Sequence, residues 1–555
     1  MVKSDLPNER NLVTQEFKDI EKQIDAICKN HLFLKNDANE ALLALFFAYE
    51  RLMDPAELVR TGLSPDLAYP HRNDGLNYAV KWVYKHSPRK KEINAILERN
   101  SYKGLIKEAE NYIQLSGNYR VFEDFTKQHY NGRYSIEISS NQVKFNFDKP
   151  SLWAREQHFR NLDDINVHQL LLEKSGIATQ QFFILYSRKA PTKKEIHIFW
   201  EVRITEIAEL HIKQMVDGYF NDKLFFQKPY RGLTLEVLTK FWSYLFSLAS
   251  ILINENILCN QYRYQKEPLV IIHDLDDFRT NLIAKGLNSK DIETILELFT
   301  YNPNRSNEDV QIAYLFKLDS KIIILPNLIT TNNLVRNYRH SISLYDNKFY
   351  TTRGGWADIF SEQLINRIKN LFDSTGFFTI VNRNYSTNIH QNTIAGDIDV
   401  AAWNEEVIFF IEAKALKEPD SELEMRNADD QLVKAQEQLL SLEDVCQNRP
   451  SLIKQAIHEL KPELSNMRKI FLIVTDAYLG TEFVNQTFLI LNYLILSNIF
   501  ERNNNQPAII KLLEHYPRLP YLEETIGYQK VSIGNFEILF PLSRVKDKSE
   551  FTVVS

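Results

Sequence analysis

Two short runs of alternating apolar and polar residues constrain this chain more than any other feature of its sequence. They are residues 394–403 and 407–416, and Asn404-Glu405-Glu406 stands between them. Alternation with a period of two is typical of β-strands, and a short polar segment between two such runs is typical of a hairpin turn. We therefore predict a β-hairpin over these residues.

This hairpin carries three acidic residues and one lysine that can share a face. Side chains alternate between the two faces of a strand, so Asp397 and Asp399 share a face of the first strand, and Glu412 and Lys414 share a face of the second. An antiparallel register that joins an odd position of the first strand to an even position of the second puts all four on one side. Either Asp399 or Asp397 can then stand opposite Glu412, and the sequence leaves both registers open.

The gathering of carboxylates indicates a metal site. Three carboxylates on one face repel each other and disfavour folding unless positive charge lies among them. Lys414 supplies one positive charge, and a divalent cation would supply the rest. Carboxylate oxygens suit Mg²⁺ or Mn²⁺, and Mg²⁺ usually keeps water and substrate phosphate as further ligands. The pattern favours hydrolysis of phosphodiester bonds, and the alternative is an exposed hairpin with solvated charges.

The segment Gly396-Asp397-Ile398-Asp399, followed after twelve residues by Glu412-Ala413-Lys414, resembles the signature of a known family. It is similar to that of the PD-(D/E)xK nucleases, which include type II and Mrr-like restriction enzymes and archaeal Holliday-junction resolvases. The family's Pro-Asp is replaced by a Gly-acidic-x-Asp variant that is common in the superfamily. The resemblance covers roughly residues 350–500. It implies that Asp399, Glu412 and the carbonyl of Ala413 hold the metal, and that Lys414 positions or activates the attacking water. From its place on the shared face, Asp397 is a further candidate metal ligand, with Glu362 as the alternative.

A helix predicted before the hairpin carries a further candidate. Residues 356–372 have apolar residues at helical spacing, and Glu362 lies at the edge of that apolar stripe. Members of the family often place a Glu that binds metal or positions water on this helix, so the resemblance makes Glu362 a catalytic candidate. A solvated helix charge is the alternative. Residues 377–384 are predicted to form a strand, which completes the order helix, strand, strand, strand of the family core.

A helix predicted after the hairpin, over residues 427–445, carries polar residues beside its apolar face. These are Gln431, Lys434 and Gln438. Related nucleases frequently use a Gln or Lys of this helix near the scissile phosphate, so the resemblance implies Gln431 as a catalytic candidate, with Lys434 beside it. The Gln-x-x-x-Tyr form found in such nucleases is absent here.

The remainder of the chain is predicted to form further α and β structure in front of the nuclease region. Of 555 residues, 44% are hydrophobic and 16 are Gly, which favours ordered, largely helical structure. We predict an α+β protein with a helical domain over 1–117, an α+β middle domain over 118–344, and a restriction-endonuclease-like αβββαβ core within 345–555. Gly354-Gly355 is the predicted hinge before that core. Other expected elements are strands over 119–122, 134–138, 142–147 and 468–475, a hairpin made of 181–186 and 195–204, and an apolar helix over 481–499.

Charge, cysteine spacing and hydropathy indicate the cellular location and the kinds of partner that we expect. The net charge is -6, with the acidic excess in residues 346–555, so no global basic field attracts nucleic acid. The three cysteines are far apart and predict neither a disulfide framework nor a zinc finger. The N-terminus lacks a signal-peptide pattern, and the longest apolar run, 241–253, is shorter than the roughly 20 residues that cross a bilayer. We expect a cytoplasmic protein without a membrane partner.

The functional prediction is a Mg²⁺-dependent nuclease, with Mn²⁺ as an alternative metal and DNA favoured over RNA as the partner. The front of the chain carries no recognised motif. By analogy at the level of the family, its size suggests that it senses, selects or gates, as in prokaryotic restriction and antiviral (phage-defence) effectors. Homo-oligomerisation is left open. The alternative is a catalytically silent nuclease-fold protein that acts as a binding or scaffold module.

Overall fold

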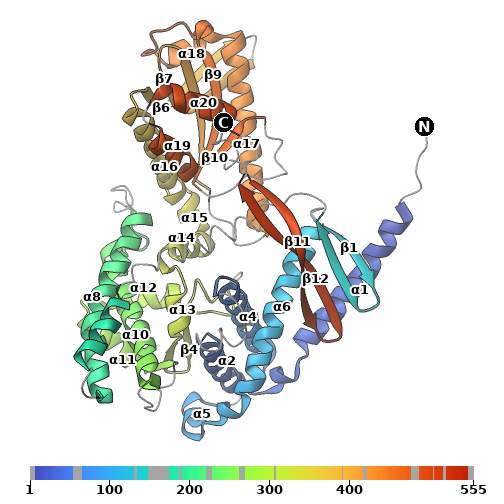
Figure 1. Cartoon of the computed structure of the whole chain (residues 1–555), viewed down its shortest axis with the longest axis vertical. Helices are drawn as coiled ribbons and strands as arrows, with labels where there is room; N and C mark the ends of the chain where they lie inside the picture. The colour runs from blue at the N-terminus through green and yellow to red at the C-terminus, as the bar shows by residue number, and fades with distance from the viewer. Residues whose placement is uncertain are drawn as a thin grey trace.

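A computed structural model shows a mixed α+β protein, as predicted. Its described strands form three sheets, and Figure 1 shows the sheet that contains β6–β10 at one end of the molecule, with the helices of the front part at the other. The structure describes residues 7–53, 65–89, 91–130, 134–147, 174, 176–186, 190–219, 228–261, 269–305, 308–389, 392–416, 422–476, 487–503, 505–516 and 521–547.

The first part of the chain is helical. Its helices are α1 (Pro7–Lys29), α2 (Ala38–Leu52), α4 (Pro65–His86), α5 (Ile93–Arg99) and α6 (Ile106–Tyr130), with 3-10 turns at Leu32–Lys35 and Ser101–Leu105. The strand predicted over 119–122 is wrong, because these residues lie inside α6. Tyr119 and Phe122 stand one helical turn apart and pack against Trp82 and Phe17, with ring centroids 5.0 and 6.0 Å away. The predicted domain boundary at 117/118 therefore falls within a helix.

A four-stranded sheet joins the two ends of the chain. The predicted strands β1 (Tyr134–Ser139) and β2 (Gln142–Phe147) form a hairpin, and β2 also pairs in parallel with β12 (Phe536–Asp547). β12 pairs in turn with β11 (Tyr521–Ile533), which gives the order β1-β2-β12-β11. The last hairpin of the chain thus packs with the front of the molecule, as Figure 1 shows.

A short helix and the long helix α8 (Lys193–Tyr219) occupy the region where a hairpin is predicted. Residues 176–185 are helical, and α8 lies beside α10 (Leu235–Gln261). The alternating apolar residues from 196 to 204 fit a helix as well as a strand. Ile196, Trp200 and Ile204 recur every fourth residue and are buried, whereas Ile198 and Val202 are 48% and 58% exposed. Alternation over so short a run does not distinguish the two structures.

Helix α10 is also long and apolar enough to cross a membrane by length and composition, and it is the one helix of the described residues that passes this test. More than half of its most apolar window is buried inside the protein. Core helices of soluble proteins have the same composition, so this observation is weak evidence for a membrane span.

Smaller elements connect α10 to the last large sheet. A three-stranded antiparallel sheet has the order β3-β5-β4 and contributes to the main core of the front part. The elements are β3 (Ile271–Asp274), α11 (Leu275–Ala284), α12 (Ser289–Phe299), β4 (Leu315–Leu318), β5 (Lys321–Ile324), α13 (Pro326–Thr330), α14 (Leu334–Tyr345) and α15 (Asn347–Thr351).

The predicted nuclease region contains a five-stranded mixed sheet with the order β10-β9-β8-β7-β6. Strands β6, β7 and β8 are antiparallel neighbours, and β8, β9 and β10 are parallel. The chain order of helix, three strands, helix and strand agrees with the predicted order. The elements are α16 (Trp356–Ser374), β6 (Phe378–Ile389), β7 (Asn392–Trp403), β8 (Val407–Lys414), α17 (Glu422–Asn448), α18 (Pro450–Ala456), a 3-10 turn at Leu464–Asn466, β9 (Arg468–Thr475), β10 (Leu489–Asn492), α19 (Tyr493–Arg502) and α20 (Gln506–His515).

Helices cover both faces of this sheet. On one face, Phe372 of α16 packs against Phe409 of β8 with ring centroids 5.3 Å apart. On the other face, Leu439 of α17 belongs to the same buried cluster as Phe410 of β8. Such burial on both sides explains why β8 is almost continuously apolar.

Two boundaries differ from the prediction for this region. Helix α17 begins at Glu422, five residues before the predicted start. The apolar helix predicted over 481–499 is wrong at Leu489–Asn492, which forms strand β10, and is confirmed from Tyr493, where helix α19 begins. Residues 481–486 lie outside the described residues. A short apolar run next to a buried parallel strand carries no period that separates strand from helix.

The junction with the front part, where a hinge is predicted, is a packed turn. Trp356, the first residue of α16, is fully buried, and its indole Nε1 donates a hydrogen bond to the carbonyl of Lys228 at 3.1 Å. Lys228 Nζ donates to the carbonyl of Gly354 at 2.7 Å. A Cβ on Gly355 would lie 2.5 Å from the carbonyl oxygen of Thr352. Glycine is thus required here by close packing.

Candidate active site at a fork in the sheet

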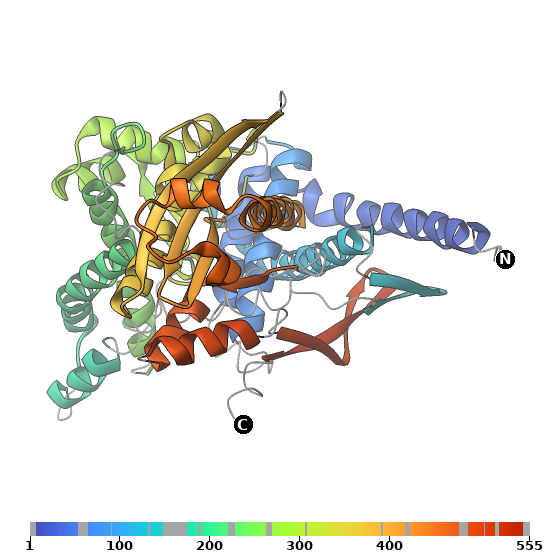
Figure 2. The same ribbon diagram turned by 90° about the horizontal axis from the view of Figure 1, so that it is seen from above.

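Strands β7 and β8 separate at the predicted site. They pair only from Trp403 opposite Ile408 to Val400 opposite Ile411. Beyond that point β7 continues with β6, and β8 continues with β9 as far as Lys414. We call this divergence the fork. Figure 2 shows the β6–β7 hairpin extending as a long ribbon beyond the rest of the sheet.

The register of the hairpin decides which carboxylates meet. The last pair of the ladder is Val400 and Ile411, and the next step of the same register places Asp399 opposite Glu412. This is one of the two registers that the sequence left open. At the fork, Oδ2 of Asp399 accepts a hydrogen bond from the backbone N–H of Ala413 at 2.8 Å. The carboxylate therefore takes the place of a strand partner where the ladder ends.

The same hydrogen bond indicates the direction of the Ala413 carbonyl. In a β-strand, the N–H and C=O of one residue point to the same side, because residues of a hydrogen-bonded pair exchange both bonds. Since the N–H of Ala413 points at Asp399, its carbonyl also faces the fork. This is the orientation that the predicted ligand role requires.

Lys414 joins the strand to helix α17. Its Nζ donates to Oε1 of Glu412 at 2.6 Å and to Oε1 of Gln438 at 2.9 Å. Glu412 is 3% exposed, whereas a fifth of the Lys414 side chain remains exposed. The ammonium group is thus held beside a buried carboxylate, on a side chain that is partly exposed.

Burial and mutual repulsion raise the pKa values of both carboxyl groups. Burial is the largest cause for Glu412, followed by the charge of Asp399, and together they raise its pKa to about 7 against the opposing charge of Lys414. Burial also raises the pKa of Asp399, and the N–H of Ala413 and Lys414 partly oppose it. The two carboxyl groups are close enough to share a hydrogen bond. Such a pair favours a proton or a cation between its oxygens.

The donor set at the fork fits a hard divalent cation. Two carboxylates and one carbonyl are ligands that Mg²⁺ accepts, with water and phosphate in the remaining positions. Among the described residues, no group of three or more His, Cys, Asp or Glu side chains is placed to hold a metal. Asp399, Glu412 and the Ala413 carbonyl are the groups that would hold the cation.

Two further predicted residues lie apart from this pair. Asp397 is exposed, and its register partner is Asn384 of β6. Glu362 is exposed on α16. That helix packs in one cluster with Ala413 and Ile411, whose side chains point to the face opposite Glu412 and Lys414. The structure therefore does not bring Glu362 to the carboxylate pair.

On α17, the residue that reaches the fork is Gln438. Gln431 and Lys434 are both exposed, and Gln431 precedes Gln438 by two helical turns, or about 10 Å along the axis. The sequence places all three on one side of the helix. Only the position of β8 relative to α17 decides which of them meets Lys414.

Sequence reasoning missed Tyr385. This residue stands opposite Gly396 in the β6–β7 ladder and is buried. A Cβ on Gly396 would lie 2.3 Å from the phenol oxygen, so the ring occupies the space above the glycine. Burial is the main cause that raises the pKa of Tyr385; a hydrogen bond with Ser441 of α17 opposes it, and the charges of Asp397 and Glu412 add to it. An aromatic residue opposite a glycine in a hairpin is the signal that could have identified it.

Comparisons with known proteins do not identify a function for these residues. No protein-family model matches the chain, and searches of curated proteins and of solved structures found no match. The chemistry of the fork is therefore inferred from its own side chains.

Proposed function

We propose that this protein is a metal-dependent nuclease whose active site is the fork between β7 and β8. The observation that carries the proposal is the convergence of Asp399, Glu412 and Lys414 where the two strands separate. Asp399 accepts a hydrogen bond from the backbone N–H of Ala413 at 2.8 Å, and the ammonium group of Lys414 lies 2.6 Å from Oε1 of Glu412. The resemblance to the PD-(D/E)xK signature and the matching order of elements support the same proposal.

Each residue has a distinct role in the proposed reaction. Asp399, Glu412 and the Ala413 carbonyl hold Mg²⁺ or Mn²⁺, which stabilises negative charge on the scissile phosphate when bound. Lys414 orients the attacking water and offsets charge that develops in the transition state. Gln438 accepts a hydrogen bond from Lys414 and thereby fixes the direction of its ammonium group. Asp397, exposed beside the fork, is available to the substrate-bound metal as an outer carboxylate.

The second candidate is a nuclease-fold protein that binds a partner without catalysis. The acidic excess of residues 346–555 favours it, because a strongly negative surface opposes tight binding to nucleic acid. A substrate panel separates the two candidates. Single-stranded, double-stranded and nicked DNA and RNA, each with Mg²⁺ and with Mn²⁺, should include at least one cleaved substrate, with DNA expected first.

The assignment of residues is tested by two substitutions. Lys414→Ala and Asp399→Asn should each lower the cleavage rate at least about 100-fold, since each removes a group that acts on the reacting phosphate. Lys511→Ala, which removes an exposed lysine of α20, is the matched control and should cleave at the normal rate. Circular dichroism and thermal melting establish that each variant is folded. Full Mg²⁺-dependent cleavage by folded Lys414→Ala would refute the assignment.

A further inference from the structure

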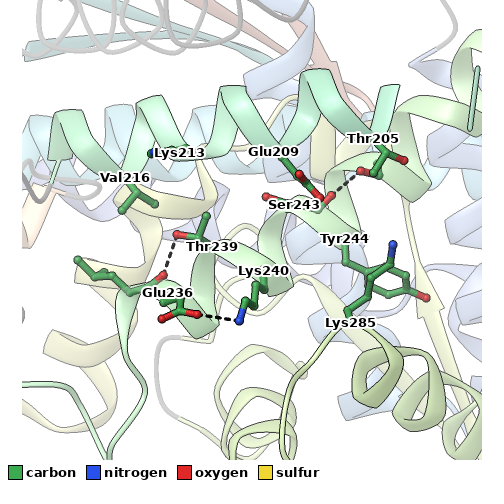
Figure 3. Close-up of a pocket in the computed structure, with 12 residues that line it drawn as sticks. Thr205, Glu209, Lys213, Val216, Glu236, Thr239, Lys240, Ser243, Tyr244 and Lys285 are labelled. Atoms are coloured by element: carbon green, nitrogen blue, oxygen red, sulfur yellow. Dashed lines mark hydrogen bonds and ion pairs between the residues drawn. The ribbon is translucent and has the colours of Figure 1, made fainter. Parts of the chain in front are cut away.

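A pocket of about 490 Å³ lies between α8 and α10 of the front part, as Figure 3 shows. Two hydroxyls that line it, those of Thr239 and Ser247, each donate a hydrogen bond of 2.7 Å to a backbone carbonyl of α10. Glu236 pairs with Lys240 of the same helix at 2.8 Å. These polar groups are engaged within α10, so we infer no ligand site between the two helices.

The fork has two branches whose separation the strand ladder does not fix. Pairing between β7 and β8 ends at Val400 and Ile411, and beyond that point one branch is made of β6 and β7 and the other of β8 and β9. Asp399 lies on the first branch and Glu412 on the second, and the charge of Asp399 repels that of Glu412. Contacts outside this ladder must therefore hold the two carboxyl groups at one distance.

Helix α17 contacts both branches through residues that are one turn apart. Gln438 accepts a hydrogen bond from Lys414, at the end of β8, at 2.9 Å. Ser441, three residues later, lies within hydrogen-bonding reach of the hydroxyl of Tyr385 on β6. Residues three apart are neighbours on the surface of a helix, so a single turn of α17 spans the fork.

The ring of Tyr385 is fixed between its own branch and α17. It stands opposite Gly396 in the β6–β7 ladder, and its phenol oxygen lies where a Cβ on residue 396 would be. The ring therefore leans across β7, which a glycine at this position permits. It is 4% exposed and belongs to the same buried cluster as Ile398 of β7 and Leu442 of α17. Tyr385 thus joins α17 to the segment of β7 that leads to Asp399.

We propose that Tyr385 and Ser441 are positioning residues of the proposed metal site. Their contact fixes the β6–β7 branch to α17, as Gln438 fixes β8. Asp399 and Glu412 are thereby held at the separation at which both bind one cation. This role rests on the proposed function, because it requires that the two carboxylates hold a metal. Residues behind the ligands of a metal site commonly change its affinity by 10–100-fold.

The role is tested by Mn²⁺ binding to the full-length protein, measured by calorimetric titration without nucleic acid. EDTA removes bound metal beforehand, and dialysis removes the EDTA. Tyr385→Phe removes the hydroxyl and keeps the ring over Gly396, and Ser441→Ala removes the other half of the contact. Each should weaken Mn²⁺ binding about tenfold. Because both remove the same contact, the double variant should bind Mn²⁺ no more weakly than either single variant.

Three further variants separate this role from a general effect on the fold. Ser441→Thr keeps a hydroxyl at an exposed position of α17 and should bind Mn²⁺ as the parent protein does. Tyr528→Phe removes the hydroxyl of an exposed tyrosine in a different sheet, where it donates to Asn146 at 2.7 Å. Ser497→Ala removes a hydroxyl of α19 that donates to Glu501 at 3.0 Å. Both of these controls should leave Mn²⁺ affinity unchanged, and thermal melting establishes that every variant is folded.

The possible failures of the two proposals differ. Unchanged Mn²⁺ affinity in either Tyr385→Phe or Ser441→Ala, or losses that add up in the double variant, would overturn the positioning contact and leave the proposed metal site standing. A parent protein that bound no Mn²⁺ would refute the metal site itself, and the positioning role with it.

Discussion

At Glu412 of the proposed site, burial raises the pKa while the charge of Lys414 lowers it. Its carboxyl group lies at the end of a buried strand, next to a second carboxyl group and in contact with one ammonium group. The raised pKa means that, without metal, the folded protein holds a proton there that the unfolded chain releases. The proposed metal site and this stability cost therefore have the same origin.

This cost predicts how stability depends on pH. Below the ordinary Glu pKa of 4.5 the group is protonated in both states and costs nothing. As pH rises from 4.5 through about 7, the unfolded chain ionises first, so stability is lost over this window. Glu412→Gln should therefore raise the stability of the metal-free protein at pH 8 by about 1–3 kcal/mol and change little at pH 5.

Thermal melts in EDTA at the two pH values measure this difference. With Mg²⁺ in place of EDTA at pH 8, the parent protein should be stabilised and the variant should not, because the variant lacks the proposed ligand. If Glu412→Gln changed the stability equally at pH 5 and pH 8, the ionisation of Glu412 would not be the cause of that change.

Gly396 and Tyr385 form a second pair of residues whose effects are coupled. Gly396→Ala should destabilise the protein by about 1–3 kcal/mol, because its methyl group would overlap the buried phenol ring. The same substitution in a Tyr385→Ala background should cost distinctly less, since the ring that it meets is absent. A double-mutant cycle by chemical denaturation measures the coupling. Additive effects would show that the ring does not explain the glycine.

At the scale of elements, the spacing of apolar residues alone does not determine whether a segment forms a helix or a strand. The faces that are buried against neighbouring elements determine it. In α8, residues 195–204 alternate as a half-buried strand would, yet the helix buries only every fourth residue. In α17, one side of the helix carries three polar residues of similar chemistry, and its placement over β8 selects Gln438. Packing partners resolve both ambiguities.

The α8 helix is tested by substitutions that a strand would not tolerate in the same way. Ile198 and Val202 share a strand face with Trp200, but on the helix they are exposed while Trp200 is buried. Val202→Gln should therefore change stability by less than about 0.5 kcal/mol, and Trp200→Ala should cost about 3–5 kcal/mol. Urea denaturation measures both. Comparable losses from the two variants would contradict the helical face.

The α17 helix offers a matched pair for activity. Gln438→Ala should lower the cleavage rate about tenfold, because Lys414 loses the acceptor that directs its ammonium group. Gln431→Ala, two turns earlier, should have little effect, since that side chain is exposed. Single-turnover rates with the substrate found in the panel compare the two. A larger loss for Gln431→Ala would return that residue to the site.

At the scale of the whole molecule, the front part contacts the sheet close to the fork. Arg339 of α14 lies 3.7 Å above the ring of Phe360, donates to the hydroxyl of Tyr350 at 3.0 Å, and pairs with Asp476 at 3.5 Å. Asp476 follows Thr475, the register partner of Lys414. Arg339 therefore ties α14 to the end of β9, which lies next to Lys414 at the end of β8.

This contact predicts that the front part supports catalysis. Arg339→Lys keeps the charge but removes the planar guanidinium group, which stacks on Phe360 and donates to Tyr350 at the same time. This substitution should lower the cleavage rate at least about tenfold. The matched control is Arg231→Lys, which changes an exposed arginine paired with Glu297 on the front surface. Rates are compared at a temperature where melting curves show every variant folded. An unchanged rate for Arg339→Lys would mean that the front only supports the sheet mechanically.

The sequence by itself determined the parts of this protein that depend on neighbouring residues in the chain. The hairpin, its turn, the order of elements around it and the candidate set of Asp399, Glu412 and Lys414 follow from alternation and spacing, because these patterns act over a few residues. The helical start of the chain followed from apolar spacing for the same reason.

The tertiary structure determined the features that depend on which faces of separate helices and strands pack together. The register that sets Asp399 opposite Glu412, the fork where their carboxyl groups meet, the choice of Gln438 on α17, and the glycine beneath Tyr385 all arise from contacts between separate elements. The helices at 119–122 and 193–204 and the strand β10 are likewise selected by their packing partners. Burial of a whole face outweighs local preference, since its free energy is summed over many contacts.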